Sequence, residues 1–195
     1  MSLQGYLEFW RVLNPYLLSA SWAFIFVSFL ICYRCINIRW FVGSIAVIQM
    51  LGILLTPWMK AQGIMYYFYI SVFDLLIIIS IIFRPNICLY LSRTDHGMFG
   101  FLLRPFANLA KAAHQTYNMI GQEMLLVVVY AFSILLNMLS FIEKIARNEG
   151  INSMLIWYSF APMKLLTWVV SVLAITTAAM YAYKGMEEEI YTKKD

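Results

Sequence analysis

Long apolar runs separated by short polar segments dominate this sequence and predict membrane-spanning helices. The clearest run, residues 64–83, has twenty residues and one charged side chain, Asp74. A helix rises about 1.5 Å per residue, so this run covers the hydrocarbon core of a bilayer, which is about 30 Å thick. The same pattern predicts five spans, at residues 15–36, 40–58, 64–83, 124–142 and 163–183.

The predicted fold class is all-α: a polytopic integral membrane helical bundle of about five spans, or four if one apolar segment is re-entrant or interfacial. The polar segments include one long connector, residues 84–122, and a charged tail, residues 184–195. Within the connector, residues 105–121 place apolar side chains on one helical face behind Pro105. This pattern predicts an amphipathic helix on the membrane surface or on a partner.

Composition supports a single membrane domain over residues 1–195. The chain is 63% hydrophobic and only 12% charged, whereas soluble domains carry about 25% charged residues. The spans leave no room for a sizeable soluble domain. No metalloprotease, nucleophile-elbow, phosphate-loop or dinucleotide motif occurs, so we expect neither an enzyme nor a cofactor.

Asp74 is the first candidate functional residue, because a carboxylate in mid-membrane is costly and should face protein or water. If the turn between the second and third spans lies near residue 61, Gln49 and Asp74 sit at the same depth on neighbouring helices. Gln49 is then a candidate hydrogen-bond partner of Asp74. The carboxyl could serve as an ion or proton site, lock subunits together, or be a protonated structural group. Lys164, at the start of its span, is able to snorkel towards the membrane surface.

Lys and Arg residues set the expected orientation, because cytoplasmic loops carry an excess of them. If the connector 84–122 is cytoplasmic, nine basic residues lie on that side and five on the other. The nine are Arg34, Arg39, Arg84, Arg93, Arg104, Lys111, Lys184, Lys193 and Lys194, and the five are Arg11, Lys60, Lys144, Arg147 and Lys164. The N-terminus is then outside and the C-terminus inside.

The basic residues of the connector and tail are the predicted contact sites for a protein partner or for anionic lipid headgroups. They are Arg84, Arg93, Arg104, Lys111, Lys193 and Lys194. A plain positive-inside loop is the alternative. Direct nucleic-acid binding is not expected, because the positive charges are few and scattered.

Cys32 and Cys35 form a Cys-x-x-Cys pair at the end of the first predicted span. A membrane thiol oxidoreductase would use such a pair, but the expected side is reducing and Cys88 is the only other cysteine. Packing of small apolar side chains is the favoured interpretation. His96 and His114 have too few neighbouring ligands for a predicted metal site.

The overall plan resembles small polytopic proteins of bacterial conflict systems, in particular the membrane subunit of the Kiwa anti-phage defence system. The resemblance rests on length, the nearly all-membrane chain, the basic connector 84–122 and the tail ending Tyr191-Thr192-Lys193-Lys194-Asp195. It implies four spans, one fewer than the hydropathy pattern predicts. It also implies a homo-oligomer in the inner membrane and a soluble cytoplasmic partner that acts on phage DNA.

The expected function is therefore an oligomeric inner-membrane sensor and scaffold of an anti-phage defence complex, which recruits a soluble cytoplasmic effector. A pore- or channel-forming effector is one alternative, with Asp74, Gln49 and Asn137 along a shared lumen. A membrane immunity protein against a pore-forming toxin is another. A Cys-x-x-Cys oxidoreductase is the third.

Overall fold

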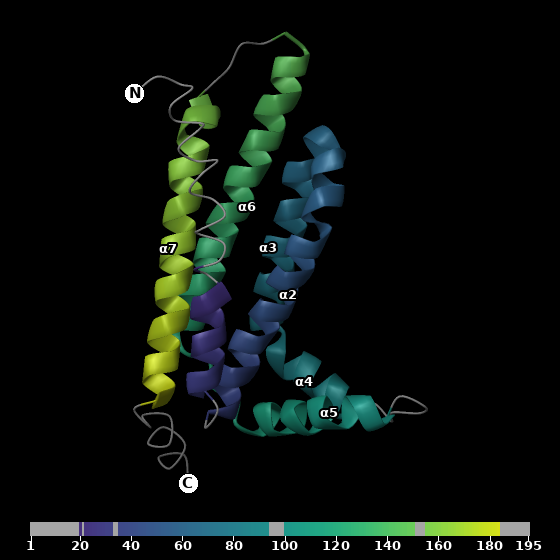
Figure 1. Cartoon of the computed structure of the whole chain (residues 1–195), viewed down its shortest axis with the longest axis vertical. Coiled ribbons are helices and arrows are strands. Elements are labelled where there is room, and N and C mark those ends of the chain that lie inside the picture. Colours follow the sequence, from purple (N-terminus) through teal and green to yellow (C-terminus); the bar gives the residue numbers. More distant parts are fainter. Residues whose placement is uncertain (1–19, 21, 33–34, 94–99, 151–154, 184–195) are drawn as a thin grey trace.

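The computed structural model of this chain describes residues 20, 22–32, 35–93, 100–150 and 155–183 (Figure 1). These ranges contain helices and no strand, so the all-α prediction is confirmed for the described chain. In order, the elements are a short helix Trp22–Ile31, α2 (Ile36–Ala61), the 3₁₀ turn η2 (Gly63–Met65), α3 (Tyr66–Ile82), α4 (Arg84–Arg93), α5 (Gly100–Gln115), α6 (Gly121–Asn148) and α7 (Leu155–Tyr183).

Four of the described helices are long and apolar enough to cross a membrane. They are α2, the η2–α3 unit, α6 and residues Pro162–Ala182 of α7. They correspond to the last four predicted spans, and the chain is a multi-pass helical membrane protein. The first predicted span, 15–36, is described in part as the helix Trp22–Ile31, which is shorter than a span. The rest of it lies largely outside the described residues, so a fifth span stays a prediction.

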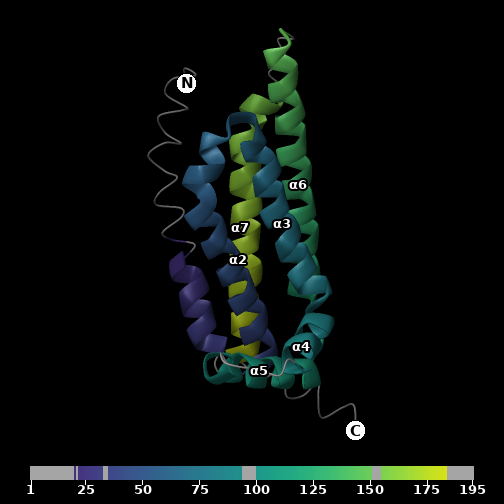
Figure 2. The same ribbon diagram turned by 90° about the vertical axis from the view of Figure 1, so that its right-hand side faces the viewer.

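The four long helices lie side by side and alternate in direction (Figures 1 and 2). A tight turn joins α2 to α3, as the short polar segment there predicts. Gly63 has a φ of 64° in this turn, a left-handed conformation that glycine adopts without the steric cost of a Cβ atom. Because the turn is short, equal distances along α2 and α3 correspond to equal depths in the membrane.

All four long helices contribute to one apolar core. It includes Phe41 of α2, Ile77 of α3, Leu126 of α6 and Ala178 of α7, each at most 2% exposed. The alanines at 174, 178 and 182 repeat every four residues and are all buried, so they share the inner face of α7. Small side chains at this spacing let helix backbones approach closely, which favours helix association in a bilayer.

The outer face of the bundle is also apolar. Leu54, Val128 and Met180 are each more than 60% exposed. In water such a surface would be an association site, whereas in a bilayer it meets lipid chains. The inner and outer faces of these helices are therefore both apolar, and buried polar groups mark the inner face instead.

Helices α4 and α5 form an end platform beneath the bundle, and α5 runs across the axes of the long helices (Figures 1 and 2). Cys88 of α4 packs with Ala110 and Ala113 of α5, and Ile36 and Trp40 of α2 cover this small cluster. The connector is therefore folded against the bundle. The predicted amphipathic helix exists but begins earlier, at Gly100, and ends at Gln115, so Pro105 lies within it.

Candidate functional site

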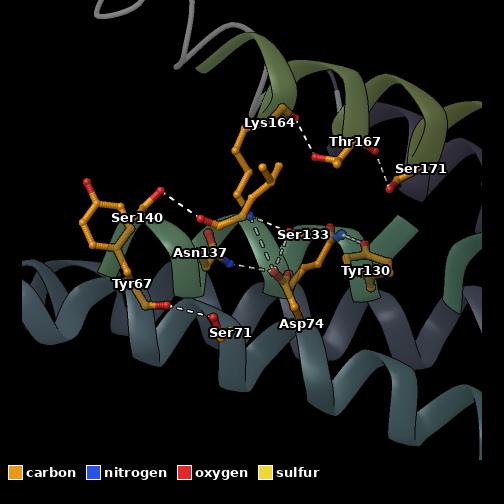
Figure 3. A network of polar contacts seen from close by, with 12 residues as sticks. Tyr67, Ser71, Asp74, Tyr130, Ser133, Asn137, Ser140, Lys164, Thr167 and Ser171 are labelled. Carbon is orange, nitrogen blue, oxygen red and sulfur yellow. Dashed lines mark hydrogen bonds and ion pairs between the residues drawn. The ribbon is translucent and has the colours of Figure 1, made fainter. Parts of the chain in front are cut away.

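Polar side chains from α3, α6 and α7 meet inside the bundle (Figure 3). Asp74 lies eight residues after the start of α3, Lys164 nine residues after the start of α7, and Asn137 eleven residues before the end of α6. At about 1.5 Å per residue, all three positions lie about 12–17 Å from the same end of the bundle. Neighbouring antiparallel helices thus bring them to similar depths.

The carboxylate of Asp74 is the centre of this cluster and is only 9% exposed. Ser133 Oγ donates a hydrogen bond to Asp74 Oδ2 at 2.6 Å. Asn137 Nδ2 donates to the same oxygen at 3.0 Å. Lys164 Nζ lies 3.6 Å from it. The prediction that Asp74 faces protein is confirmed, and one carboxylate oxygen collects donors from α6 beside a cation from α7.

Lys164 points into the bundle, so the prediction that it snorkels to the membrane surface is wrong. The reason is the length of α7, which begins at Leu155 rather than near residue 163. Lys164 is therefore an interior residue of its helix. Its Nζ donates a hydrogen bond to Ser133 Oγ, and Ser133 in turn donates to Asp74. Lysine, serine and aspartate form a continuous chain of donors and acceptors.

Gln49 does not bond to Asp74, so the predicted pair is wrong. Gln49 Nε2 donates instead to the Tyr130 hydroxyl at 3.0 Å. The depth argument was sound, because Gln49 and Asp74 line the same cavity. Tyr130, Ser133 and Asn137 lie on the same face of α6, and the packing of this face against α2 and α3 sets Ser133 and Asn137 against Asp74 and Tyr130 against Gln49.

Asn137 lies in the interior of α6, which continues to Asn148. Its side chain is 0% exposed. The amide nitrogen bonds to Asp74, while the amide oxygen has no hydrogen-bond partner among the described residues. A buried acceptor without a donor costs about 1–3 kcal/mol, so this oxygen is part of the energetic cost of the cluster.

A cavity of about 400 Å³ lies beside this cluster, between α2, α3, α6 and α7. Its polar lining residues include Gln49, Asp74, Tyr130, Ser133, Lys164, Thr167 and Ser171, and its apolar walls include Ile25, Ile53, Ile70, Phe73, Val129, Trp168 and Ile175. A mostly apolar cavity with a few convergent polar groups is typical of small-molecule sites.

A second buried ion pair fixes the end platform to the bundle. Arg84, the first residue of α4, is 1% exposed, and Glu123, in the first turn of α6, is 0% exposed. Arg84 Nη1 lies 2.5 Å from Glu123 Oε1. Arg84 Nη2 also donates to the Asn118 carbonyl at 3.3 Å. Nearby, Asn37 Nδ2 donates to the same carbonyl at 2.9 Å, so α2, α4 and α6 meet at one polar junction.

The predicted role of Arg84 as an exposed partner- or lipid-binding residue is wrong, because this guanidinium is buried against Glu123 and over the Tyr117 ring, 4.6 Å from its centre. Lys111, by contrast, is exposed on α5. The side chains of Arg93 and Arg104 fall outside the described residues, and so do Lys193 and Lys194 entirely. Their predicted contacts stay predictions.

Within the described chain, no disulfide bond joins any of the three cysteines. Cys32 is 0% exposed and belongs to the main core, and Cys35 packs against that core, in line with the packing interpretation. Burial in the end platform raises the pKa of the Cys88 thiol to about 11, although nearby Arg84 opposes this shift. Within the described ranges no three His, Cys, Asp or Glu side chains gather as a metal site; His96 lies outside those ranges.

Three residues of the two buried polar clusters were not predicted as site residues: Ser133, Glu123 and Lys164. Serine within an apolar run is common, and nothing in its spacing distinguishes Ser133 from its neighbours. Glu123 and Lys164 each sit near a predicted span end, where charged residues usually meet water. No family model matches the chain, and no curated protein or solved structure is significantly similar to it.

Proposed function

We propose that this protein is a non-enzymatic scaffold of a membrane complex and presents its end platform to a soluble cytoplasmic partner. The observation that carries the proposal is the folded state of the connector, in which the Arg84–Glu123 pair and the Cys88 cluster hold α4 and α5 against the bundle. A plain loop would need no such anchoring. A surface that is ordered before binding loses less entropy when a partner docks.

The distribution of basic residues supports a cytoplasmic position for this end. The platform end carries Arg39, Arg93, Arg104 and Lys111 besides the buried Arg84, whereas the other end carries Lys60 in the turn after α2 and Lys144 and Arg147 near the end of α6. The positive-inside tendency then favours the platform end as cytoplasmic. Its charge suits a partner with an acidic surface, because complementary charge speeds and orients association.

The proposal extends to self-association and to a sensor role in an anti-phage defence complex of the bacterial inner membrane. The support for this part is the plan-level resemblance to the Kiwa membrane subunit. In that setting the soluble partner would be the effector, and this chain would be its membrane anchor.

Purification of the tagged protein from its host in mild detergent tests the proposal. We expect a soluble protein to co-purify at a fixed ratio to a multimer of this chain, as measured by mass spectrometry and light scattering. Lys111→Glu should reduce that ratio. Lys60→Glu, the same charge reversal at an exposed site on the other end of the bundle, should leave it unchanged. A bare multimer or a bare monomer would contradict the scaffold.

A pore-forming effector is the second candidate, because Gln49 and Asp74 line one half-open cavity between the long helices. The cation of Lys164 beside Asp74 weighs against a simple cation path. Expression of a pore should depolarise cells, and Asp74→Asn should alter the conductance of purified protein in planar bilayers. A bare monomer without conductance would instead favour an immunity protein.

A further inference from the structure

The half-open cavity between the four long helices has two features that helix packing alone does not require. Its volume, about 400 Å³, lies within the range of about 300–1,000 Å³ that is usual for ligand sites. It also contains a charged pair, whereas apolar packing would suffice to hold four helices together. Polar groups inside a bilayer are costly and most often mark a ligand or ion pathway.

The charges of the cavity lining balance. Among the described lining residues, Asp74 is the only anion and Lys164 the only cation, and they lie 3.6 Å apart. An ion of either sign would meet one attractive and one repulsive charge there. A ligand that carries both charges side by side matches both groups at once, and leaves neither buried charge without a counter-charge.

Hydrogen-bonding capacity remains at both charged groups. Asp74 Oδ1 accepts no hydrogen bond from the described residues, since Ser133 and Asn137 both donate to Oδ2. An ammonium has three donors, and Lys164 uses one of them on Ser133. Gln49 has a side-chain carbonyl as a further acceptor beside the Tyr130 hydroxyl. The cavity can therefore offer acceptors to an ammonium and donors to an oxyacid group.

The remaining walls select for an apolar substituent. Ile53, Phe73, Val129 and Trp168 line the cavity from all four long helices. We propose that this cavity binds the zwitterionic end of an amphipathic molecule, in which an ammonium and an oxyacid group are adjacent and an apolar group follows. The ammonium lies against Asp74, the oxyacid group against Lys164, and the apolar group against Trp168 and Phe73.

Two sources can supply this chemistry: a free apolar amino acid, or a zwitterionic lipid such as phosphatidylethanolamine. Neither source depends on the proposed scaffold role, because none of the described platform residues lines the cavity. A ligand bound in this cavity is thus a candidate for the signal that a sensor would detect. The proposed ligand site remains valid even if no soluble partner binds the platform.

Binding to the full chain in detergent tests this inference. The probes are leucine, tryptophan, N-acetyl-leucine, leucinamide and phosphatidylethanolamine, and the measurement is isothermal titration supported by native mass spectrometry for the lipid. We expect saturable binding of at least one intact zwitterion. N-acetyl-leucine lacks the ammonium and leucinamide lacks the carboxylate, so each should bind about tenfold or more weakly than leucine if leucine is the ligand.

Variants separate the cavity from the rest of the fold. Asp74→Asn and Lys164→Met should each weaken binding by about tenfold or more, while Lys164→Arg, which keeps the charge, should restore most of it. Lys111→Met makes the same chemical change on the platform surface and should bind like the wild type. Monodisperse size-exclusion profiles show which variants are folded. Gln49→Leu is a further cavity variant, and it leaves both charges in place.

The outcomes are distinct. Saturable binding of leucine or tryptophan assigns the site to free amino acids, and binding of phosphatidylethanolamine alone assigns it to a lipid headgroup. No saturable binding of any intact zwitterion up to about 10 mM would overturn the inference. Unchanged binding in folded Asp74→Asn and Lys164→Met proteins would overturn it too.

Discussion

Removal of one partner of the Arg84–Glu123 pair should strongly destabilise the protein. Both side chains are at most 1% exposed and their charged atoms lie 2.5 Å apart. Arg84→Met leaves the Glu123 carboxylate buried without its cation, and Glu123→Leu leaves the guanidinium without its anion. Breaking a buried pair in this way costs about 3–5 kcal/mol.

The double variant distinguishes two causes of lost stability: the lost attraction between Arg84 and Glu123, and the buried charge that each single variant leaves without a partner. Arg84→Met with Glu123→Leu removes both charges and fills the space with apolar groups, so we expect it to be more stable than either single variant. At about 2–4 °C per kcal/mol for a chain of this size, each single variant should lower the melting temperature by about 6–20 °C. The double variant should recover at least half of that loss.

Melting in mild detergent, followed by the fraction that remains monodisperse on size exclusion, measures this effect. Lys111→Met is the matched control, since it removes a positive charge from an exposed site of the same platform. Hydrogen exchange adds a local readout, because α4 and α5 should lose protection before the long helices do. Single variants that melt within about 2 °C of the control, or a double variant as unstable as the worse single, would refute the reasoning.

Three further perturbations have defined outcomes. Gly43→Leu should displace the short helix Trp22–Ile31 and lower the melting temperature more than Gly43→Ala, because a Cβ there already sits in tight contact, 3.3 Å from the Phe29 ring, and leucine adds further carbons beyond it; equal melting of the two would contradict this. Cys88 should resist alkylation by iodoacetamide at pH 8 in mild detergent, and it should react only after a denaturing detergent unfolds the chain. Because its pKa rises from 9.0 to about 11 on folding, its stabilising contribution is complete below pH 9 and is lost towards pH 11, a trend that Cys88→Ala should lack. Gln62→Cys and Lys111→Cys, each in a cysteine-free background, should react with an impermeant maleimide from opposite sides of sealed vesicles; labelling from one side would disprove the arrangement.

Local patterns in the chain were sufficient for the helix class and for most of the spans. A run such as 64–83 is long and apolar enough to cross a bilayer wherever it packs, because insertion depends on length and hydropathy within the run itself. The tight turn at Gly63 follows from its short polar segment in the same way. The equal depth of Gln49 and Asp74 followed from counting residues along a hairpin.

Helix boundaries were the first point at which the pattern misled. The helices α6 and α7 continue beyond their apolar runs, to Asn148 and from Leu155. Hydropathy marks only the part of a helix that meets lipid. Lys164 therefore seemed to lie near a span end, although it is an interior residue of its helix. Glu123 was missed similarly, because a charge at a span end normally needs no buried partner.

Pairing across helices was determined by tertiary structure alone. Depth is a one-dimensional quantity that residue counting supplies, but a hydrogen bond also needs the right rotation of each helix about its axis. That rotation results from the packing of whole helix faces, such as the alanine face of α7 against the core. It directs Asp74 to Ser133, Asn137 and Lys164, and it turns Arg84 from a surface charge into a buried anchor. The sequence determined which segments cross the membrane, and the packing decided which of their polar groups meet.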